Sequence, residues 1–431
     1  MHLPTDHEQR FQLNNEVHAR PPESLVAPVR ISFLAMFAAG DRGEDRRHVR
    51  DLAEQHGLTP PGDGDVHYSA DFGRFRLKWE RHTEFSRIKV IVPGPSEMDL
   101  FRVPATSAIS EEWLSGFPGR LMTATHVEIR PKPKKLPDPE ALSAQSFGGH
   151  PLIGSEIAGG LGTAYTDLRI HADGFSRLLI DDGGMTPRQL GRSVQRILEI
   201  DTYRMMALLA FPVARAFGPK LTGQERELAQ IMSAMASEMA AEEPKLLDRL
   251  TRLQAAIESG YAESDYRFSA SKAYYELVQR RTEELRENRL EGLQTFQEFT
   301  ERRLMPAMNT CAAVARRQEA LSSRVARATQ LLSTRVEVAR TQQNQQVLAT
   351  MARRAHLQLR LQQTVEGLSV AAVTYYVVGL VSYVAKAVSE VGVPVSPAIV
   401  VALSVPIVAG SVWYGVKRVR QRLEAADDDD A

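Results

Sequence analysis

The sequence lacks the features that mark several large classes of protein. A single cysteine, Cys311, excludes an internal disulfide and any zinc cluster built on several cysteines. The 53 basic side chains are matched by 53 acidic ones, so the positive field that nonspecific nucleic-acid binding needs is absent and we expect no nucleic-acid partner. The N-terminal segment MHLPTDHEQR is too polar to be a signal peptide. At 431 residues and 43% hydrophobic, the chain is long and apolar enough for two or three folded units.

Motifs that carry catalysis or hold cofactors are also missing. The segment 148–155 (GGHPLIGS) has no lysine to reach a phosphate, and 159–162 (GGLG) lacks the spacing of a dinucleotide-binding turn. Neither a His-Glu-x-x-His nor a Gly-x-Ser-x-Gly motif occurs. We therefore assign no catalytic residue and expect no cofactor, and an enzyme is the least supported class of function.

Histidine is concentrated in the first part of the chain without a ligand pattern. Ten of the 11 histidines lie before residue 172. Pairs such as His67 with His82, or His126 with Glu128, can meet on strands, but histidines on half-exposed strand faces are mostly structural. We predict no metal site. Cys311, on a predicted helix, is interpreted as a small packing residue.

Proline is scarce in the second half of the chain. Before residue 221 lie 18 of the 23 prolines, and between Lys245 and Val393 the only one is Pro306. Long helices tolerate proline poorly, so the first half is predicted to be mixed α/β and the second half helical.

Apolar runs and alternation locate the elements of the first half. The predicted elements are a buried strand at Val29–Phe37, a helix at Gly43–His56, an antiparallel hairpin of Arg74–Arg81 with Ile88–Val92, and strands at Leu121–Arg130, Asp167–His171 and Ser176–Ile180. The alternating polar residues of the hairpin predict that only one of its faces is covered.

Two capping signals predict where helices begin. Thr186, followed by Pro187 and Gln189, has the form of a capping box and predicts a helix to about Leu209, and Thr222 with Glu225 repeats the signal. From Glu263 the pattern is helical, with an interruption near Pro306. From Ala307 onward, one continuous helix can extend into an apolar segment.

Two long uncharged stretches lie near the C-terminal end. Residues 367–385 are 19 residues without a charge, enough for a helix of about 28 Å, and residues 391–416 are a second such stretch. We expect two membrane spans, at about 367–387 and 396–416.

The fold class is predicted to be α+β. The predicted domains are an α/β cytoplasmic head (1–185), a helical domain and stalk (186–366), a transmembrane hairpin (367–416) and a basic, then acidic, cytoplasmic tail (417–431).

Basic residues flank the two predicted spans on one side. Those we expect near lipid headgroups or another anion are Arg353, Arg354 and Arg360 before the first span and Lys417 and Arg418 after the second. Positive residues favour the cytoplasmic side, so both termini are predicted to be cytoplasmic, at the inner membrane of a bacterium. For the rest of the arginine-rich segment 301–360, the alternative is a solvated helix face that pairs with the acidic helix at 225–248.

Hydroxyl and small residues recur along the first span. Ser369, Tyr376 and Tyr383 are seven residues apart, with Tyr375, Gly379 and Ser382 beside them. Such a stripe is typical of a helix–helix contact, where small and hydroxylated residues pack and share hydrogen bonds. The alternative is the lining of a pore in an oligomer, narrowed by aromatic rings.

An unusual polar segment lies near the start of the chain. Glu16, His18 and Arg20 are followed by two prolines. The segment is interpreted either as an ordered extended arm or as a contact for a ligand or partner.

Three motifs carry a resemblance to a known family. These are HARP at 18–21, HPLIGSE at 150–156 and VEGLSVAA at 365–372. They resemble a bacterial family of uncharacterised membrane-anchored proteins, known as a domain of unknown function, and the resemblance covers nearly the whole chain. It implies a membrane anchor and no particular activity.

The predicted architecture also resembles the CorA-type divalent-cation transporters. Those have a mixed α/β cytoplasmic head, long helices that lead into the first of two C-terminal spans, and five identical subunits. The likeness implies a homo-oligomer, a pentamer by analogy, whose first span lines a pore. The Gly-Met-Asn signature of that family is absent, since residues 386–397 are KAVSEVGVPVSP.

The leading hypothesis is a homo-oligomeric, CorA-like membrane protein that conducts or senses ions. The alternative is a membrane-tethered binding or scaffolding protein whose spans only anchor and oligomerise.

Overall fold

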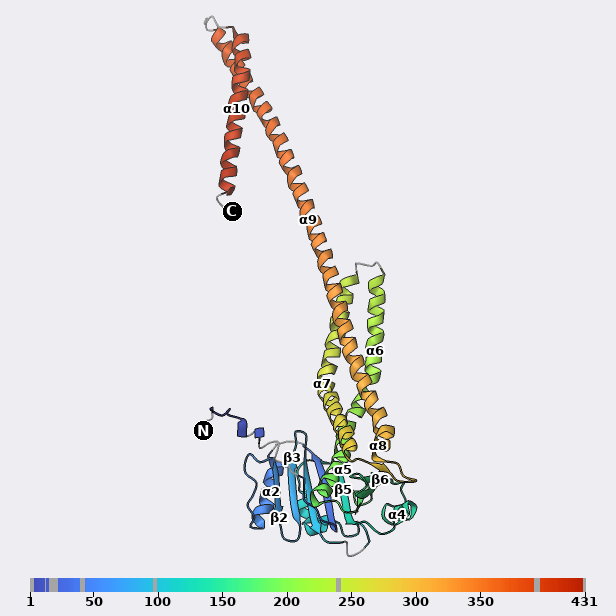
Figure 1. The fold of residues 1–431 in the computed structure, drawn as a ribbon. Helices are drawn as coiled ribbons and strands as arrows, with labels where there is room; N and C mark the ends of the chain where they lie inside the picture. Colours follow the sequence, from blue (N-terminus) through green and yellow to red (C-terminus); the bar gives the residue numbers. More distant parts are fainter. Residues whose placement is uncertain are drawn as a thin grey trace. The chain divides into compact units, whose positions relative to one another are not determined.

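The computed structural model describes residues 4–11, 13–14, 22–38, 43–95, 99–237, 242–390 and 396–428. The chain divides into two compact units, residues 1–329 and residues 330–431. The first unit contains a sheet, helices on its faces and a helical bundle, and the second contains two apolar helical segments (Figure 1). The predicted mixed α/β class with long helices is confirmed, and the predicted boundaries at 185 and 366 remain predictions.

Nine strands form one sheet in the spatial order β2-β3-β4-β1-β5-β8-β7-β6-β9. The strands are β1 (Val29–Phe37), β2 (His67–Asp71), β3 (Arg76–Arg81), β4 (Phe85–Pro93), β5 (Arg120–Pro131), β6 (Ile153–Ile157), β7 (Gly162–Thr166), β8 (Ser176–Asp182) and β9 (Asn288–Arg289). Every neighbouring pair is antiparallel except β5 and β8, which are parallel. The strand β9 comes from the otherwise helical second half of the chain.

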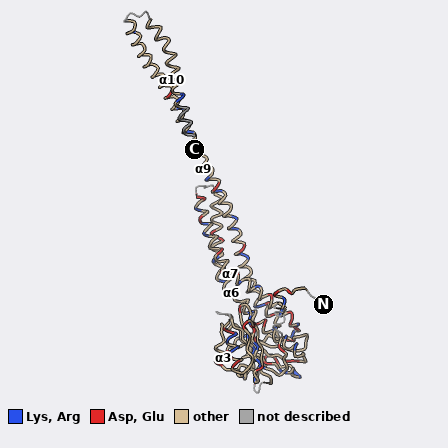
Figure 2. The backbone as a smooth tube through the Cα atoms, turned by 90° about the vertical axis from the view of Figure 1, so that its left-hand side faces the viewer, with Lys and Arg blue, Asp and Glu red and all other residues tan. Residues whose placement is uncertain are grey.

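Short helices lie around the sheet, and long ones follow it. They are α2 (Glu44–Gln55), η1 (Ala105–Ala108), α3 (Glu111–Ser115), α4 (Pro139–Ser146), α5 (Pro187–Leu208), α6 (Ala210–Ala236), α7 (Glu243–Glu284), α8 (Phe296–Phe299), the π-helical turn η3 (Thr300–Leu304), α9 (Met305–Glu390) and α10 (Pro397–Asp428). Within the first unit, α6, α7 and the beginning of α9 lie side by side as a bundle (Figures 1 and 2).

The predicted elements of the first half are confirmed, with one exception. The segment Asp167–His171 is a loop, because β7 ends at Thr166 and Leu168 turns the chain with a φ of 48°. The left-handed backbone at a leucine is incompatible with an extended strand. The antiparallel partner of β8 is therefore β7, and a longer loop joins the two strands.

One of the two predicted helix starts is wrong. The capping box at Thr186 and Gln189 is present and begins α5. Thr222, however, lies inside α6, where its hydroxyl donates to the Gly218 carbonyl at 3.1 Å. A hydrogen bond to the carbonyl four residues earlier satisfies the hydroxyl within the helix, so Thr222 does not act as an N-cap. Buried side chains such as Leu221 and Leu228 continue the packed face of α6 past the start signal.

The break in the helical second half is larger than predicted. The chain leaves the helix after Glu284 and reaches α8 only at Phe296, with positive φ at Arg286 and Gly292. The irregularity expected near Pro306 is the π-helical turn η3 just before it. A wider turn accommodates the missing N–H and the bulk of a proline ring.

One face of the sheet packs against α2 and α3 through apolar side chains. Leu77 and Trp79 of β3 and Ile88 and Val90 of β4 are all fully buried there. They belong to a core that also includes Val49, Leu52, Trp113 and Phe117. This is the covered face that the alternation of the hairpin predicts.

The opposite face of the same hairpin is buried as well, which corrects the prediction of one covered face. Lys78, Glu80, Arg87 and Lys89 are each no more than 3% exposed. In the strand register, Lys78 lies opposite Lys89 and Glu80 lies opposite Arg87. Alternation distinguishes the two faces, but it does not reveal that helices cover the polar one.

Glu199 of α5 is the centre of a buried ionic network on this face, which we call the sheet–helix network. Its carboxylate accepts from Arg87 of β4 at 3.3 Å and from Arg281 of α7 at 2.6 Å, and Arg87 also binds Glu80. Burial opposes ionisation of Glu80 and Glu199, but Arg87 and the other polar and basic neighbours together outweigh it, and the pKa of each carboxyl is lowered. Burial, together with the charge of Arg87, lowers the pKa of Lys89 to about 8.

The chain before β1 also joins this face. Glu23 lies 3.2 Å from the Nζ of Lys78, and the Leu25 amide donates to the Pro187 carbonyl at 3.1 Å. A Cβ at Gly191 of α5 would lie 1.7 Å from the Glu23 carbonyl oxygen. Only glycine permits this approach, so Gly191 allows the segment to pack against α5.

Replacement of Glu199 tests the sheet–helix network. Glu199→Gln leaves the buried Arg87 and the half-buried Arg281 with less compensating charge, so we expect the free energy of unfolding to fall by about 3–5 kcal/mol. Denaturant unfolding followed by tryptophan fluorescence, to which the buried Trp79 and Trp113 contribute, measures it. Glu225→Gln is the control, because its pair with Arg317 is partly exposed and a loss below about 1 kcal/mol is expected. Equal losses in the two variants would contradict the account.

Candidate functional site

Two helices of the chain are long and apolar enough to cross a membrane. They contain the predicted spans, and their apolar segments are only 6% buried in α9 and 0% buried in α10. A soluble core hairpin would bury most of these side chains. Figure 2 draws this part of the chain almost without charge, apart from basic residues toward the end of α10. Length, composition and exposure together indicate association with a membrane.

Within the second unit, α10 turns back alongside the end of α9 (Figures 1 and 2). Val365 and Ser369 of α9 line one cleft with Val416 of α10. Half-buried residues recur every four positions on α9 at Val370, Thr374 and Val378. This spacing defines the side of α9 that faces its own hairpin partner.

The predicted stripe on the first span divides between two sides of α9. Tyr375, Tyr376 and Tyr383 are 78%, 71% and 77% exposed, and Ser369 is exposed although its hydroxyl donates to the Val365 carbonyl at 2.8 Å. The other two residues, Gly379 and Ser382, are half-buried. The three tyrosines are therefore available to a neighbouring molecule, whereas Gly379 and Ser382 adjoin the hairpin-facing side and Ser369 lines the cleft shared with α10.

The predicted lipid-head contacts are on exposed helix surfaces. Arg353, Arg354 and Arg360 of α9 are exposed, as are Lys417 and Arg418 of α10. The ammonium of Lys417 lies 5.1 Å from the centre of the Trp413 ring. An aromatic ring beside a lysine at the end of an apolar helix is typical of a membrane interface.

Two further predicted features have different outcomes. Glu16, His18 and Arg20 of the N-terminal segment lie outside the described residues. In the arginine-rich part of α9, Arg317 pairs with Glu225 of α6 at 2.8 Å. This pair follows the expected pairing with the acidic helix.

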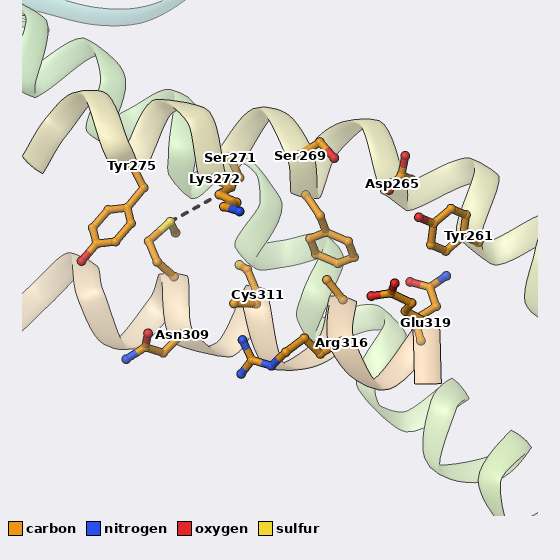
Figure 3. Close-up of a pocket in the computed structure, with 15 residues that line it drawn as sticks. Tyr261, Asp265, Ser269, Ser271, Lys272, Tyr275, Asn309, Cys311, Arg316 and Glu319 are labelled. Atoms are coloured by element: carbon orange, nitrogen blue, oxygen red, sulfur yellow. Dashed lines mark hydrogen bonds between the residues drawn. The ribbon is translucent and has the colours of Figure 1, made fainter. Parts of the chain in front are cut away.

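A groove that no sequence pattern predicted lies between α7 and α9 in the first unit (Figure 3). The groove has a volume of about 410 Å³, and Tyr261, Asp265, Lys272, Cys311, Arg316 and Glu319 are among the residues that line it. Charges of both signs surround an apolar floor. The surface is suited to a partner that presents both apolar and charged side chains, such as another helix.

Cys311 forms part of the floor of this groove. It is 4% exposed, and burial raises the pKa of its thiol to about 11. The thiolate is the reactive form of cysteine, so this side chain is chemically inert near neutral pH. Its position agrees with a packing role.

Sequence reasoning also missed a cluster of two imidazoles and a carboxylate. Oδ2 of Asp167 lies 2.9 Å from Nδ1 of His150 and 2.9 Å from Nε2 of His171. One ligand atom from each of the three side chains lies within 4.8 Å of the others, and the Asp167 side chain is fully buried. These three residues can hold a metal ion. A signal was present in the glycine-rich segment 158–161, which in the structure is the turn that joins β6 to β7.

The histidine pairs singled out from the sequence do not form such a cluster. His126 shares a hydrogen bond of 2.8 Å with the hydroxyl of Ser32 and stacks on Phe175, and burial lowers its pKa to about 4. His82 stacks on Phe85, and His67 lies opposite Glu80 on neighbouring strands. All of these are consistent with the structural interpretation.

Comparisons with known proteins give one match. The sequence model of a family described as a protein of unknown function, DUF3422, matches residues 5–423. No curated protein matches the chain. No solved structure matches it either, so the CorA-type likeness remains a prediction.

The single cysteine provides a test of the groove floor. We expect Cys311 to react with a maleimide at pH 7 far more slowly in the folded protein than after denaturation, because burial removes both access and thiolate. Mass spectrometry measures the labelled fraction. The matched control is Cys311→Ser with Ser269→Cys, which places an exposed thiol on the same groove and should react readily. Comparable rates for the two thiols in the folded state would refute the buried position.

Proposed function

Since this chain belongs to the DUF3422 family, whose function is unknown, we propose a function from the geometry: a membrane-anchored homo-oligomer, CorA-like in topology, that conducts or senses ions. The observation that carries the proposal is the apolar surface of α9 and α10, which no other part of the described chain covers. The alternative function is a membrane-tethered binding or scaffolding protein. The two share the anchor and the oligomer and differ in whether ions pass.

The distribution of aromatic and basic residues supports an anchor that crosses the bilayer twice. Trp413 and Tyr414 are 59% and 60% exposed near the end of the second apolar stretch, with Lys417 and Arg418 directly after them. Aromatic rings favour the interface between lipid and water, and basic side chains extend to the headgroups. A helix that only lay on the surface would have one polar face, whereas residues 397–416 carry no charge at all.

The same basic residues support the orientation. Arg353, Arg354 and Arg360 precede the first span, and Lys417 and Arg418 follow the second. Because α10 runs back beside α9, both groups belong on one side of the membrane. The excess of Lys and Arg favours the cytoplasmic side, so both termini are proposed to be cytoplasmic, at the inner membrane.

The exposed tyrosines support self-association. Tyr375, Tyr376 and Tyr383 present their hydroxyls in a segment where lipid tails offer no hydrogen-bond partner. Contact with another copy of the span supplies partners, at about 0.6–2 kcal/mol per interhelical hydrogen bond. The hairpin-facing side of α9 is already occupied by α10, so the tyrosine-bearing side is the one available for this contact. A pentamer rests on the CorA-type analogy alone.

The chemistry of the first span bears on the choice between the two functions. If the tyrosine side lines a pore, its polar groups are hydroxyls, because residues 367–385 contain no ionisable side chain other than tyrosine. The Gly-Met-Asn signature of CorA-type transporters is absent, so no magnesium selectivity is proposed. The groove between α7 and α9 favours the alternative function, since it offers a binding surface outside the membrane segment.

Ion flux through proteoliposomes separates conduction from tethering. We expect the full chain to dissipate an imposed cation gradient, and Tyr376→Ala and Tyr383→Ala to change the rate several-fold, because both remove rings from the same side of α9. Val377→Ala is the matched control, since it is exposed on a different side of the same helix and should leave the rate unchanged. The absence of flux under every gradient would remove conduction and leave the scaffolding function.

A further inference from the structure

Beyond the membrane anchor, we propose that His150, Asp167 and His171 form a binding site for one divalent transition-metal ion of the zinc class. The site lies in the loops before β6 and after β7, beside the sheet of the first unit, and does not depend on the spans. It would give each subunit a metal-binding centre that is separate from any ion path. The argument rests on the topology, on the ligand atoms and on the backbone that holds them.

The β6–β7 hairpin brings the three ligands together. Ile153 at the start of β6 pairs with Thr166 at the end of β7, so the residues just before β6 and just after β7 meet at one edge. His150 lies three residues before this pair and Asp167 one residue after it. The turned backbone at Leu168, with φ of 48°, directs the chain so that His171 returns to Asp167.

The ligand atoms are nearly at metal-binding separations. Both histidine nitrogens lie 2.9 Å from the same carboxylate oxygen, Oδ2 of Asp167. Around a tetrahedral zinc ion with bonds of about 2.0–2.1 Å, ligand atoms lie about 3.3–3.4 Å apart. To admit the ion, each nitrogen has to move about 0.4–0.5 Å from the carboxylate, and the two nitrogens, which lie within 4.8 Å of each other, have to reach the same separation of about 3.3–3.4 Å.

The Nε2 atom of His171 is the clearest sign of a missing partner. Its side chain is 8% exposed, and the atom is buried with no hydrogen-bond partner in the described part of the chain. The 2.9 Å contact with Oδ2 of Asp167 lacks the alignment of a hydrogen bond, unlike the bond between His150 and the same oxygen. A buried nitrogen left unsatisfied costs free energy, and a metal ion would satisfy it.

The backbone around the ligands is fixed by hydrogen bonds. The Arg169 amide donates to Oδ1 of Asp167 at 3.2 Å, which leaves Oδ2 as the oxygen directed to the histidines. The carbonyl of His150 accepts from the Ser143 hydroxyl at 2.6 Å, and the amide of His171 donates to the Phe175 carbonyl at 2.9 Å. Such outer contacts orient metal ligands and strengthen binding.

The chain before His150 passes directly over both rings. Gly148 has a φ of +65°, and a Cβ built on it would lie 3.7 Å from Cε1 of His150 and 3.9 Å from Cε1 of His171. On either side of His150, the buried Phe147 and Leu152 belong to the second apolar core of the sheet. His150 is thus held between two buried anchors, and its position is set by packing.

The donor set selects the class of metal. Two imidazole nitrogens and one carboxylate suit Zn²⁺, Co²⁺ and similar ions, whereas Mg²⁺ and Ca²⁺ prefer oxygen ligands. The His150 side chain is 34% exposed, so one side of the cluster is open to solvent. An ion bound there would keep a coordination position for water or a small anion, as three-ligand zinc sites do.

Metal binding to the full-length protein in detergent tests the proposal. After chelator treatment, we expect one Zn²⁺ per chain by calorimetry, and Co²⁺ to give visible absorption bands of a coordinated ion. His150→Gln, Asp167→Asn and His171→Gln should each weaken binding by more than the roughly 10- to 100-fold that loss of an outer-shell partner costs. They should also remove the Co²⁺ bands.

The control separates this cluster from adventitious surface binding. His356→Gln removes an exposed histidine on α9 and should leave both the stoichiometry and the Co²⁺ spectrum unchanged. Failure of the unmodified protein to bind either ion at micromolar concentration would overturn the proposal. Equal binding by the cluster variants and the unmodified protein would overturn it too. Circular dichroism of each variant verifies folding, and His150→Gln, the more exposed position, is the variant least prone to misfold.

Discussion

The apolar surface of the last two helices requires an apolar environment, and the rest of the described chain does not cover it. Leu380, Val384, Leu403 and Ile407 are 59% to 67% exposed, and the segments around them bury almost nothing. Full burial of one large aliphatic side chain contributes about 1.5–3 kcal/mol, so a row of such residues left in water is strongly unfavourable. Lipid tails meet this requirement. The association with a membrane follows from it, and the proposed oligomer starts from the same surface.

The first unit is governed by a different constraint, the satisfaction of buried charge. The polar side of the β3–β4 hairpin faces helices, and Glu199 neutralises arginines from a strand and from α7. Replacing one partner in such a network leaves uncompensated charge, so the helices cannot move independently of the sheet without a large penalty. This links the sheet to α7, which itself forms the groove with α9. A rigid connection of this kind suits either proposed function.

Sequence reasoning located most elements because each carries a local signal. The capping box at Thr186 and the proline-free segment after Ala307 are examples, and both predictions hold. The failures are tertiary. The strand expected at Asp167–His171 is a loop, and the buried polar face around Lys78 was assigned to solvent. The metal-ligand cluster was missed because 17 residues separate His150 from Asp167, and only the closing of the β6–β7 hairpin brings them together.

The central claim is that lipid surrounds the apolar segments, and depth-dependent quenching tests it most directly. Leu380→Cys, in a Cys311→Ser background, carries a fluorophore within the first span. Leu348→Cys places the same fluorophore on α9 before the span, at an almost equal exposure of 65% against 67%. In vesicles with brominated acyl chains, the account predicts strong quenching at residue 380 and little at residue 348. Equal accessibility of both positions to an aqueous quencher, with no quenching by the lipid, would contradict it.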